Sequence, residues 1–216
     1  MATWINGTAA ESFGSYTEPL GGSEPGNEKQ KNNAICLYEF FSPKGWTVNA
    51  VAAMCGNFQQ ESTINPGSLE FPTDPTRGGY GIAQWTPRTA LFDILDYLYG
   101  SHDVWADGDR QQNCVFAEYR KCIGEIPASA PFYAAWDDRM TAAYNLTFDQ
   151  WSHSTQDPGY LAMHFEWCYE RPAEVHPIRA ALARAWYEYL SGHPVPPTPG
   201  RRRKSPFWIY LRYRWR

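Results

Sequence analysis

The sequence predicts a mainly α-helical domain in which one loop-rich segment takes the place of a sheet. Two observations predict this class. Apolar residues recur at helical spacing in several segments, and residues that begin or end helices bound most of these segments. Residues 62–82, in contrast, are rich in proline and glycine and read as a loop or a short hairpin. At 216 residues the chain is long enough for one well-buried domain.

The first two predicted helices have clear boundaries. Residues 28–41 form the first, which Ser42 and Pro43 end. Residues 47–60 form the second, because positions 48, 51, 52, 55 and 58 are apolar and lie on one face. Thr47 is a candidate N-cap, and the sequence Asn65-Pro66-Gly67 prevents the helix from continuing.

Later helices follow from the same signals. Thr86 and Pro87 provide an N-cap and a first-turn proline for a helix that ends at Gly100. The next predicted helix covers residues 109–123 and ends at Gly124. The remaining predicted elements are a helix over 132–145, a short turn capped at 147 that ends near 153, a helix from 157 through 167, and a last helix over 174–190.

The ends of the chain differ from its centre in composition. Residues 1–27 are rich in Gly, Ser, Thr, Glu and Pro, and predict a flexible N-terminal arm. Residues 28–192 hold the helical pattern and form the predicted domain. Residues 193–216 combine a proline-rich spacer with a basic, aromatic C-terminal tail. We expect this tail to dock on another protein; a lipid surface, a nucleic acid or a solvated tail are the alternatives.

Charge argues against nucleic acid as the main ligand. Seven of the 19 basic residues lie in residues 201–216, so the first 200 residues hold 12 basic residues against all 23 acidic ones. Phosphate binding needs clustered positive charge, which this acidic body lacks. Charged residues make up only 19% of the chain while aromatic residues make up 16%, which suits either a sugar-binding cleft or a large aromatic core.

The sequence carries no signal for a membrane, a metal or a cofactor. Residues after Met1 do not form the apolar core of a signal peptide, and no segment has the ~20 apolar residues of a membrane span. The five histidines lack metal-ligand spacing, so we expect no metal site and no cofactor. The five cysteines form no Cys-x-x-Cys pair, and disulfides are not expected. These features predict synthesis in a cytoplasm, followed by export through another route such as packaging into a particle or release at lysis.

One acid stands where a sugar-cleaving site would need it. Glu61 ends the predicted helix 47–60, and a glycine-rich turn follows at Gly78-Gly79-Tyr80-Gly81-Ile82-Ala83-Gln84-Trp85. Cleavage of a glycosidic bond needs a carboxylic acid that gives a proton to the leaving oxygen. Glu61 is therefore the candidate general acid.

These two motifs resemble the Glu-Ser and glycine-rich glutamine motifs of lytic transglycosylases and goose-type lysozymes. The wider frame, roughly residues 30–192, resembles the phage tail lysozyme family. The resemblance implies a lysozyme-like helical domain with a small loop or β-hairpin wall to its cleft. It also implies that Glu61 is catalytic and that Ser62, Tyr80, Gln84 and Trp85 bind substrate.

The resemblance leaves the second catalytic group open. Asp74 is the first candidate and Glu70 the second; a single-acid mechanism is the third possibility. Lytic transglycosylases often carry a further Ala-Tyr-Asn-Ala-Gly motif, and here Ala143-Tyr144-Asn145 continues differently. The segment Glu170-Arg171-Pro172 resembles a family segment, but an internal ion pair that ends a helix is the simpler interpretation.

The resemblance implies a virion-associated peptidoglycan hydrolase, carried as a phage tail component. It would cleave the β-1,4 bond between N-acetylmuramic acid and N-acetylglucosamine and open the host wall as the genome is delivered. The expected partners are glycan strands and other tail proteins. A lytic transglycosylase, or an inactive structural or wall-binding module of the virion, remains the alternative.

Overall fold

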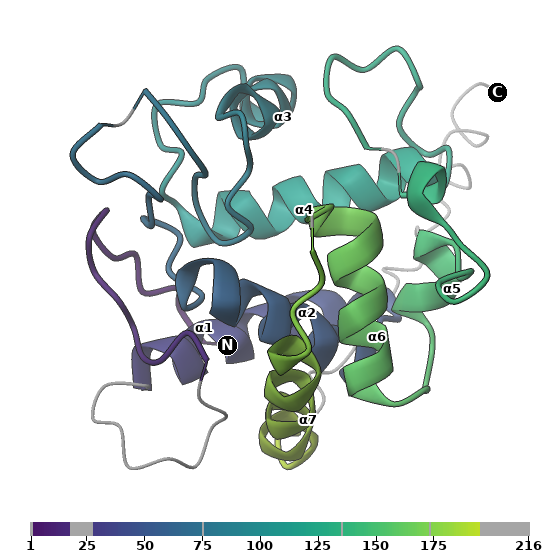
Figure 1. The fold of residues 1–216 in the computed structure, drawn as a ribbon. Coiled ribbons are helices and arrows are strands. Elements are labelled where there is room, and N and C mark those ends of the chain that lie inside the picture. Colours follow the sequence, from purple (N-terminus) through teal and green to yellow (C-terminus); the bar gives the residue numbers. More distant parts are fainter. Residues whose placement is uncertain (1, 18–27, 75, 135, 173, 195–216) are drawn as a thin grey trace, which may run out of the picture.

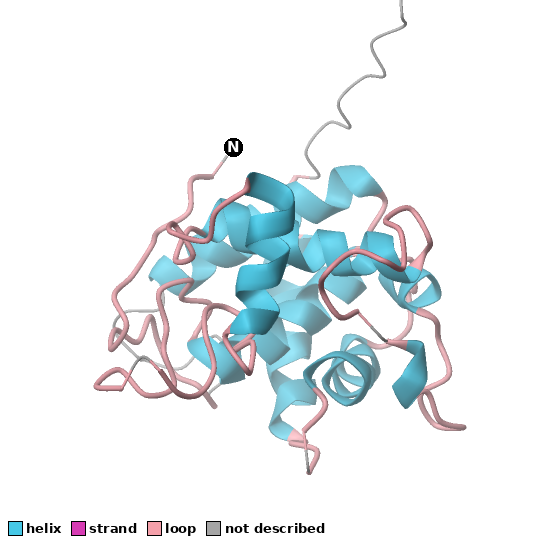
Figure 2. Cartoon of the chain, turned by 90° about the horizontal axis from the view of Figure 1, so that it is seen from above, coloured by secondary structure: helices cyan, strands magenta, loops and turns pink. Residues whose placement is uncertain are grey.

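The structure, a computed structural model, describes residues 2–17, 28–74, 76–134, 136–172 and 174–194. It is mainly helical, as the sequence predicts, and the other helices surround a central helix, α2 (Figures 1 and 2). The α-helices are α1 (Glu28–Phe41), α2 (Val48–Ser62), α3 (Thr89–Tyr99), α4 (Gly108–Cys122), α5 (Phe148–Ser152), α6 (Pro158–Phe165) and α7 (Ile178–Ser191). Shorter turns are η1 (Ser42–Lys44), η2 (Asp137–Arg139) and the π-helical turn η3 (Glu166–Glu170).

Local signals place the boundaries of the central helices. α1 has the predicted bounds, and Gly45, at φ 95°, ends the turn η1 that follows it. The side chain of Thr47 accepts a hydrogen bond from the backbone N–H of Ala50 at the start of α2. α2 ends because Thr63 and Ile64 both adopt positive φ, at 54° and 58°.

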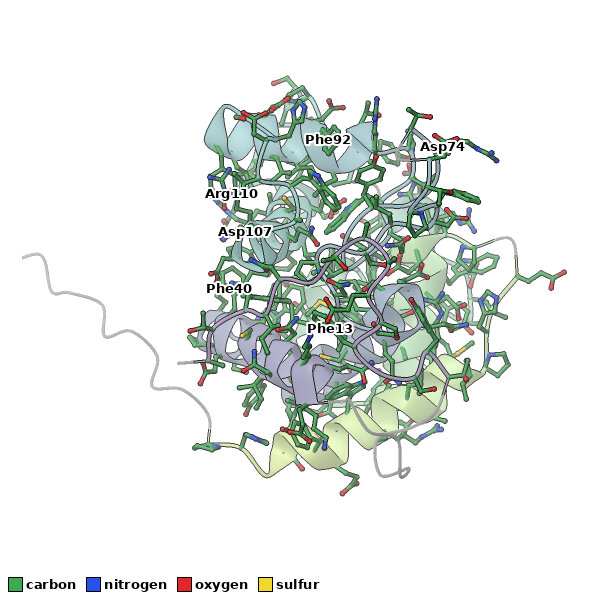
Figure 3. The ribbon with its side chains drawn as sticks, turned by 90° about the vertical axis from the view of Figure 1, so that its left-hand side faces the viewer. Phe13, Phe40, Asp74, Phe92, Asp107 and Arg110 are labelled. Atoms are coloured by element: carbon green, nitrogen blue, oxygen red, sulfur yellow. The ribbon has the colours of Figure 1, made fainter. Side chains whose placement is uncertain are left out.

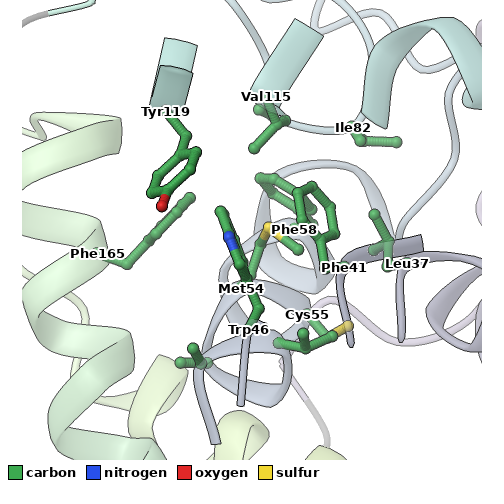
Figure 4. Packing of buried hydrophobic residues seen from close by; sticks show 14 of the residues in the cluster. Leu37, Phe41, Trp46, Met54, Cys55, Phe58, Ile82, Val115, Tyr119 and Phe165 are labelled. Carbon is green, nitrogen blue, oxygen red and sulfur yellow. The ribbon is translucent and has the colours of Figure 1, made fainter. Parts of the chain in front are cut away.

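The hydrophobic core is built around α2. Every residue of α2 from Ala50 to Gln59 is buried. Figure 4 shows Met54 and Phe58 of α2 among side chains from α1, α4, α6 and the glycine-rich turn. The aromatic residues mostly belong to this core rather than to the surface. Rings from distant segments contact one another there, and they belong to Trp46, Trp136, Phe148, Trp151 and Phe165.

A glycine allows α2 and α7 to cross closely. A Cβ atom placed on Gly56 would lie 2.7 Å from the backbone nitrogen of Ala183 and 3.0 Å from the carbonyl oxygen of Arg179. Both contacts are with backbone, which cannot move aside as a flexible side chain can. The backbone of α7 therefore lies directly against α2, and this close approach brings residues of α7 to the end of α2 that carries Glu61.

We expect Gly56→Ala to destabilise the fold by about 2 kcal/mol, because the added methyl group must push α7 away from α2. On an open helix the same change would stabilise, since alanine favours helix more than glycine does. Urea unfolding measures the difference. Gly192→Ala is the matched control, because the nearest atom to a Cβ there lies 3.7 Å away. Equal stability of the two variants would contradict this account of the crossing.

The prediction of a helix over residues 132–145 is wrong. The described part of this segment holds only the short 3-10 turn η2. The indole nitrogen of Trp136 donates to the carbonyl oxygen of Leu146 at 2.8 Å, and Thr141 and Tyr144 close a turn through their backbones. Trp136 is 2% exposed and stacks on Phe148. Burial of the Trp136 side chain requires a loop conformation of the backbone, and this tertiary contact overrides the local preference for helix.

Two further helices begin later than predicted. α3 starts at Thr89, with Arg88 at the N-cap position, so Thr86 does not cap it; Gly100 ends it as predicted, with φ 73°. α7 starts at Ile178 instead of 174. The short helix α5 is as predicted, because Thr147 and Gln150 form a reciprocal capping box.

The prediction of a flexible N-terminal arm is wrong for residues 2–17. Phe13 is 1% exposed, and its backbone N–H donates to Thr63 Oγ1 at 2.8 Å. The amide of Asn33 exchanges hydrogen bonds with the backbone of Ile5, at 2.9 Å each. Figure 3 shows Phe13 on the segment that crosses this face of the domain. Two buried aromatic rings, Trp4 and Phe13, outweigh the polar composition of the segment.

Other expectations for the ends and the cleft wall fall partly outside the described residues. Residues 18–27 lie outside them, as does the tail from residue 195 onward. The predicted hairpin in residues 62–82 is reduced to isolated bridges, Leu69 with Tyr80 and Tyr80 with Trp85.

All five cysteines are free thiols. Within the described residues, no helix combines the length and apolar character needed to cross a membrane.

Candidate active site

Glu61 lies in the last turn of α2, and its side chain is 21% exposed. The next residue, Ser62, fixes this helix end. The hydroxyl of Ser62 is in hydrogen-bond contact with the carbonyl oxygens of Phe58 at 3.1 Å and of Ile82 at 2.9 Å. The first contact lies within α2, and the second joins α2 to the glycine-rich turn. The acid and the turn are therefore held in one arrangement.

The glycine-rich turn is tied to α4 through Gln111. The backbone N–H of Ile82 donates to Gln111 Oε1 at 2.8 Å, while Gln111 Nε2 donates to the carbonyl oxygens of Pro66 and Trp105 at 2.7 and 2.6 Å. A Cβ atom on Gly81 would lie 2.5 Å from Gln111 Oε1, so only glycine fits there. Gln111 is fully buried, and it belongs to no motif that would single it out in the sequence.

A cleft of about 680 Å³ connects these parts. This volume is in the range of small-molecule binding sites. Glu61 lines it from α2, Gln84 and Trp85 from the glycine-rich turn, and Glu118 from α4. The fourth side comes from η3, the residues that follow it and the start of α7. The lining thus draws on segments up to 118 residues apart in sequence.

Arg179 binds Glu61 at one end of this cleft. The side chain of Arg179 is 4% exposed, and its Nη2 donates to Glu61 Oε1. Its Nη1 donates to Asn57 Oδ1 at 2.9 Å. The Nδ2 of Asn57 in turn donates to the carbonyl oxygens of Ala53 and Ala162, at 2.9 and 3.0 Å. Arg179 is therefore held in place by Asn57 of α2, which is itself bonded to α6, independently of its contact with Glu61.

Glu118 is a buried acid of the same cleft. Its Oε2 accepts hydrogen bonds from the hydroxyl of Tyr169 and from Trp85 Nε1, the latter at 3.4 Å. Burial raises the pKa of Glu118 to about 7, although these two hydrogen bonds and the charge of Arg171 lower it. Glu118, which lines the cleft, therefore changes charge near neutral pH.

Glu118→Gln should change how stability depends on pH. The pKa of Glu118 is about 7 in the folded protein against 4.5 without burial, so the folded state holds a proton that the unfolded chain releases. The wild type therefore loses stability as pH rises from about 4.5 to 7. Glutamine has no such proton, so the variant should gain about 3 kcal/mol relative to the wild type over this range, at ~1.4 kcal/mol per pKa unit.

Urea unfolding of both proteins at several pH values measures this gain. The glutamine side chain of the variant can still accept hydrogen bonds from Tyr169 and Trp85. The difference in free energy of unfolding between the two proteins therefore reports on the proton of Glu118. A difference in free energy of unfolding that is the same at every pH would mean that Glu118 titrates normally.

The structure separates the predicted substrate-binding residues into two groups. Gln84 and Trp85 line the cleft, whereas Ser62 and Tyr80 do not. Ser62 is fully buried, and Tyr80 is 3% exposed, with its ring packed against Phe92 and Trp105 at centroid distances of 5.6 and 5.0 Å. The prediction that Ser62 and Tyr80 contact substrate therefore needs correction. The hydroxyl of Ser62 and the ring of Tyr80 make their contacts inside the protein instead.

Asp74 does not lie on the cleft lining, whereas Glu70 does. The carboxylate of Asp74 accepts from the hydroxyl and the backbone N–H of Thr76, at 2.6 and 3.2 Å. These hydrogen bonds lower the pKa of Asp74. Figure 3 shows Asp74 at the edge of the molecule. Glu70 accepts from the backbone N–H of Gly79 at 2.9 Å, which holds it beside the glycine-rich turn.

Four charged residues of the cleft were not predicted as site residues: Glu118, Glu170, Arg171 and Arg179. Glu170, Arg171 and Pro172 all line the cleft, so the segment is more than a helix end. Arg171 adopts φ 58° and lies over the ring of Tyr133, its guanidinium 4.6 Å from the ring centroid. The resemblance of residues 170–172 to a family segment was the one signal that could have placed them here.

A helical domain that presents an acid from a helix end, beside a glutamine-bearing glycine turn, has the architecture of a lysozyme-like protein. A family model described as phage tail lysozyme matches residues 32–190, and the chain belongs to that family. It is also similar to morphogenesis protein 1 of Bacillus phage B103, with 31% identity over 163 residues. The alignment covers 74% of this chain and 40% of that relative, so the chain spans less than half of the relative's length.

Proposed function

We propose that this chain is a virion-associated peptidoglycan hydrolase that cleaves the β-1,4 bond between N-acetylmuramic acid and N-acetylglucosamine. The observation that carries the proposal is the shared cleft of Glu61, Gln84 and Trp85 in a member of the phage tail lysozyme family. Glu61 is the proposed general acid for the glycosidic oxygen. The amide of Gln84 suits N-acetyl groups, and the ring of Trp85 suits a sugar face.

The setting of the proposed activity is the phage tail, where the enzyme opens the host wall as the genome is delivered. The family description and the phage relative support this setting. Glycan strands are the proposed substrate, and other tail proteins are the proposed partners. The basic, aromatic segment 201–216 is the proposed docking element, on the strength of its composition.

Mass spectrometry of digested cell wall tests the reaction. The purified chain is incubated with peptidoglycan, and the released fragments are analysed. Reducing ends support hydrolysis, whereas 1,6-anhydro ends show transglycosylation. Binding to the wall without any release would leave an inactive binding module and overturn the proposal.

For the second carboxylate, the geometry favours Glu70 over Asp74, because Glu70 lines the cleft and Asp74 is engaged by Thr76. We expect Glu70→Gln to lower cleavage by at least ~10-fold, whereas Asp74→Asn should change it by less than ~3-fold. Initial rates of release of reducing ends measure both effects. The reverse order would return the role to Asp74, and two unchanged rates would support a single-acid mechanism.

A further inference from the structure

The cleft carries more acidic side chains than basic ones. Among the described residues that line it, the acids are Glu61, Glu70, Glu118 and Glu170, and the basic side chains are Arg171, His176 and Arg179. An acidic lining repels a ligand that carries a carboxylate unless a cation meets that carboxylate directly. Such a ligand therefore depends on one of these three basic residues.

Arg179 and His176 already serve acids of the protein. The side chain of Arg179 is 4% exposed; its Nη2 donates to Glu61, and its Nε lies 3.1 Å from Glu166 Oε1. The Nδ1 of His176 lies 2.7 Å from the same oxygen of Glu166. Glu166 is fully buried, so it depends on these partners to remain charged inside the protein. Arg171 is therefore the basic residue of the cleft lining that best suits a ligand.

Arg171 differs from Arg179 in exposure and in backbone conformation. It is partly exposed and lines the cleft directly after η3. Its φ of 58° is in the left-handed region, which residues other than glycine rarely adopt and which is common at ligand-binding sites. Burial raises the pKa of Glu118 and of Cys168, and the charge of Arg171 opposes both shifts. The positive charge of Arg171 therefore acts on groups that line the cleft.

Tyr133 supports the guanidinium group of Arg171. The guanidinium carbon lies 4.6 Å from the centre of the Tyr133 ring, and the Tyr133 hydroxyl donates to Asp138 Oδ2 at 2.9 Å. Tyr133 lines the cleft and is 63% exposed, the largest value among the large apolar and aromatic side chains that the structure describes. A ring with this exposure at a cleft suits packing against a sugar. The ring and the guanidinium thus form one surface with an aromatic part and a cationic part.

We propose that Arg171 and Tyr133 form a carboxylate-binding subsite of the cleft. This inference rests on the proposed function. Arg171 binds a carboxylate of the glycan strand through its planar N–H groups, and Tyr133 packs against the sugar that carries it. Peptidoglycan offers a carboxylate on the lactyl group of muramic acid or on the peptide stem, whereas chitin has N-acetylated sugars without one. The subsite therefore makes the cleft select peptidoglycan over neutral glycans.

Titration calorimetry tests the subsite without any need for cleavage. The Glu61→Gln protein is titrated with three probes. One is a tetrasaccharide of N-acetylglucosamine and N-acetylmuramic acid with free lactyl carboxylates, one is the same tetrasaccharide with peptide stems, and one is chitotetraose. We expect a further Arg171→Gln substitution to weaken binding of at least one carboxylate probe by ~10-fold or more. Binding of chitotetraose should change by less than ~2-fold.

The pattern across the probes identifies the carboxylate. A loss confined to the bare tetrasaccharide assigns the lactyl group, and a loss confined to the stem-bearing probe assigns the peptide. An equal loss for all three probes would overturn the inference, as would unchanged binding of both carboxylate probes. Absence of binding by every probe would overturn it as well.

Arg110→Gln is the matched control for Arg171→Gln. Its guanidinium lies 4.7 Å from the ring centre of Tyr99, so the pair has the same chemistry, but neither residue lines the cleft. This variant should bind all three probes as the parent protein does. Equal losses in the Arg110 and Arg171 variants would show an effect of overall charge and overturn the subsite.

Tyr133→Ala is a second test, which remains if Arg171→Gln does not fold. An exposed ring contributes little to stability, and its removal should weaken the same carboxylate probes by at least ~3-fold. Unchanged binding in this variant would overturn the pairing of Tyr133 with Arg171. No cleavage of peptidoglycan by the wild type would count against the proposed function, while the calorimetric differences would still report on the subsite. The two failures are therefore distinguishable.

Discussion

Replacing Glu61 with glutamine is expected to lower cleavage of peptidoglycan by at least ~10²-fold. Glutamine keeps the size of the side chain but has no proton to give to the glycosidic oxygen. Its Oε1 can still accept the hydrogen bond that Arg179 Nη2 donates to Glu61. The variant should therefore fold and bind the wall as the wild type does. Release of reducing ends measures the rate, and co-sedimentation with insoluble wall measures binding.

Two outcomes would contradict the role of Glu61. Cleavage within a few-fold of the wild type would show that another group supplies the proton. Loss of wall binding together with loss of activity would show that the substitution disturbs the cleft itself. Glu188→Gln, the same chemical change on the outer face of α7, should leave both readouts unchanged.

Replacing Arg179 with leucine is expected to cost about 3–5 kcal/mol of stability at neutral pH. Leucine removes the cation that Glu61 and Glu166 share, and Glu166 is fully buried. The folded variant then binds protons more tightly than its unfolded chain does. Its stability relative to the wild type should rise as pH falls, because protonation removes the unbalanced negative charge. Urea unfolding at several pH values measures both effects.

Arg184→Leu is the matched control on the same helix. Arg184 pairs with Asp157 at 2.7 Å, but both side chains are about half exposed. An ion pair in water contributes little, so this variant should lose less than ~1 kcal/mol. If the two arginine variants lose the same stability, the cluster around Arg179 does not depend on its charge.

The sequence predicted the helices whose ends are marked by local chemistry. Thr47, Thr147 and Gly100 act through their own backbone neighbours, so α2, α5 and the end of α3 could be placed without tertiary information. Residues 132–145 have helical spacing too, but burial of Trp136 against distant rings decides their conformation. The segment 2–17 is similar, since Phe13 is buried by contacts with residues about 50 positions away.

The same distinction holds for the site. Glu61 and Gln84 could be named as candidates because each belongs to a short motif, and both line the cleft. Arg179 was not found, because in the sequence it is one more arginine on an amphipathic helix. Its role depends on the crossing of α2 and α7 at Gly56, which joins residues 118 positions apart. No local pattern carries that information.

The π-helical turn η3 is a place where the chain length can change without turning the residues on either side. A π-turn holds one residue more than a regular α-turn of the same helix. Because the wider turn accommodates this extra residue locally, deletion of one residue there would leave an ordinary α-turn that continues from α6, and the flanking residues would keep nearly the same orientation. A one-residue gap at η3 in the sequence of a homologue is therefore compatible with a cleft of the same geometry.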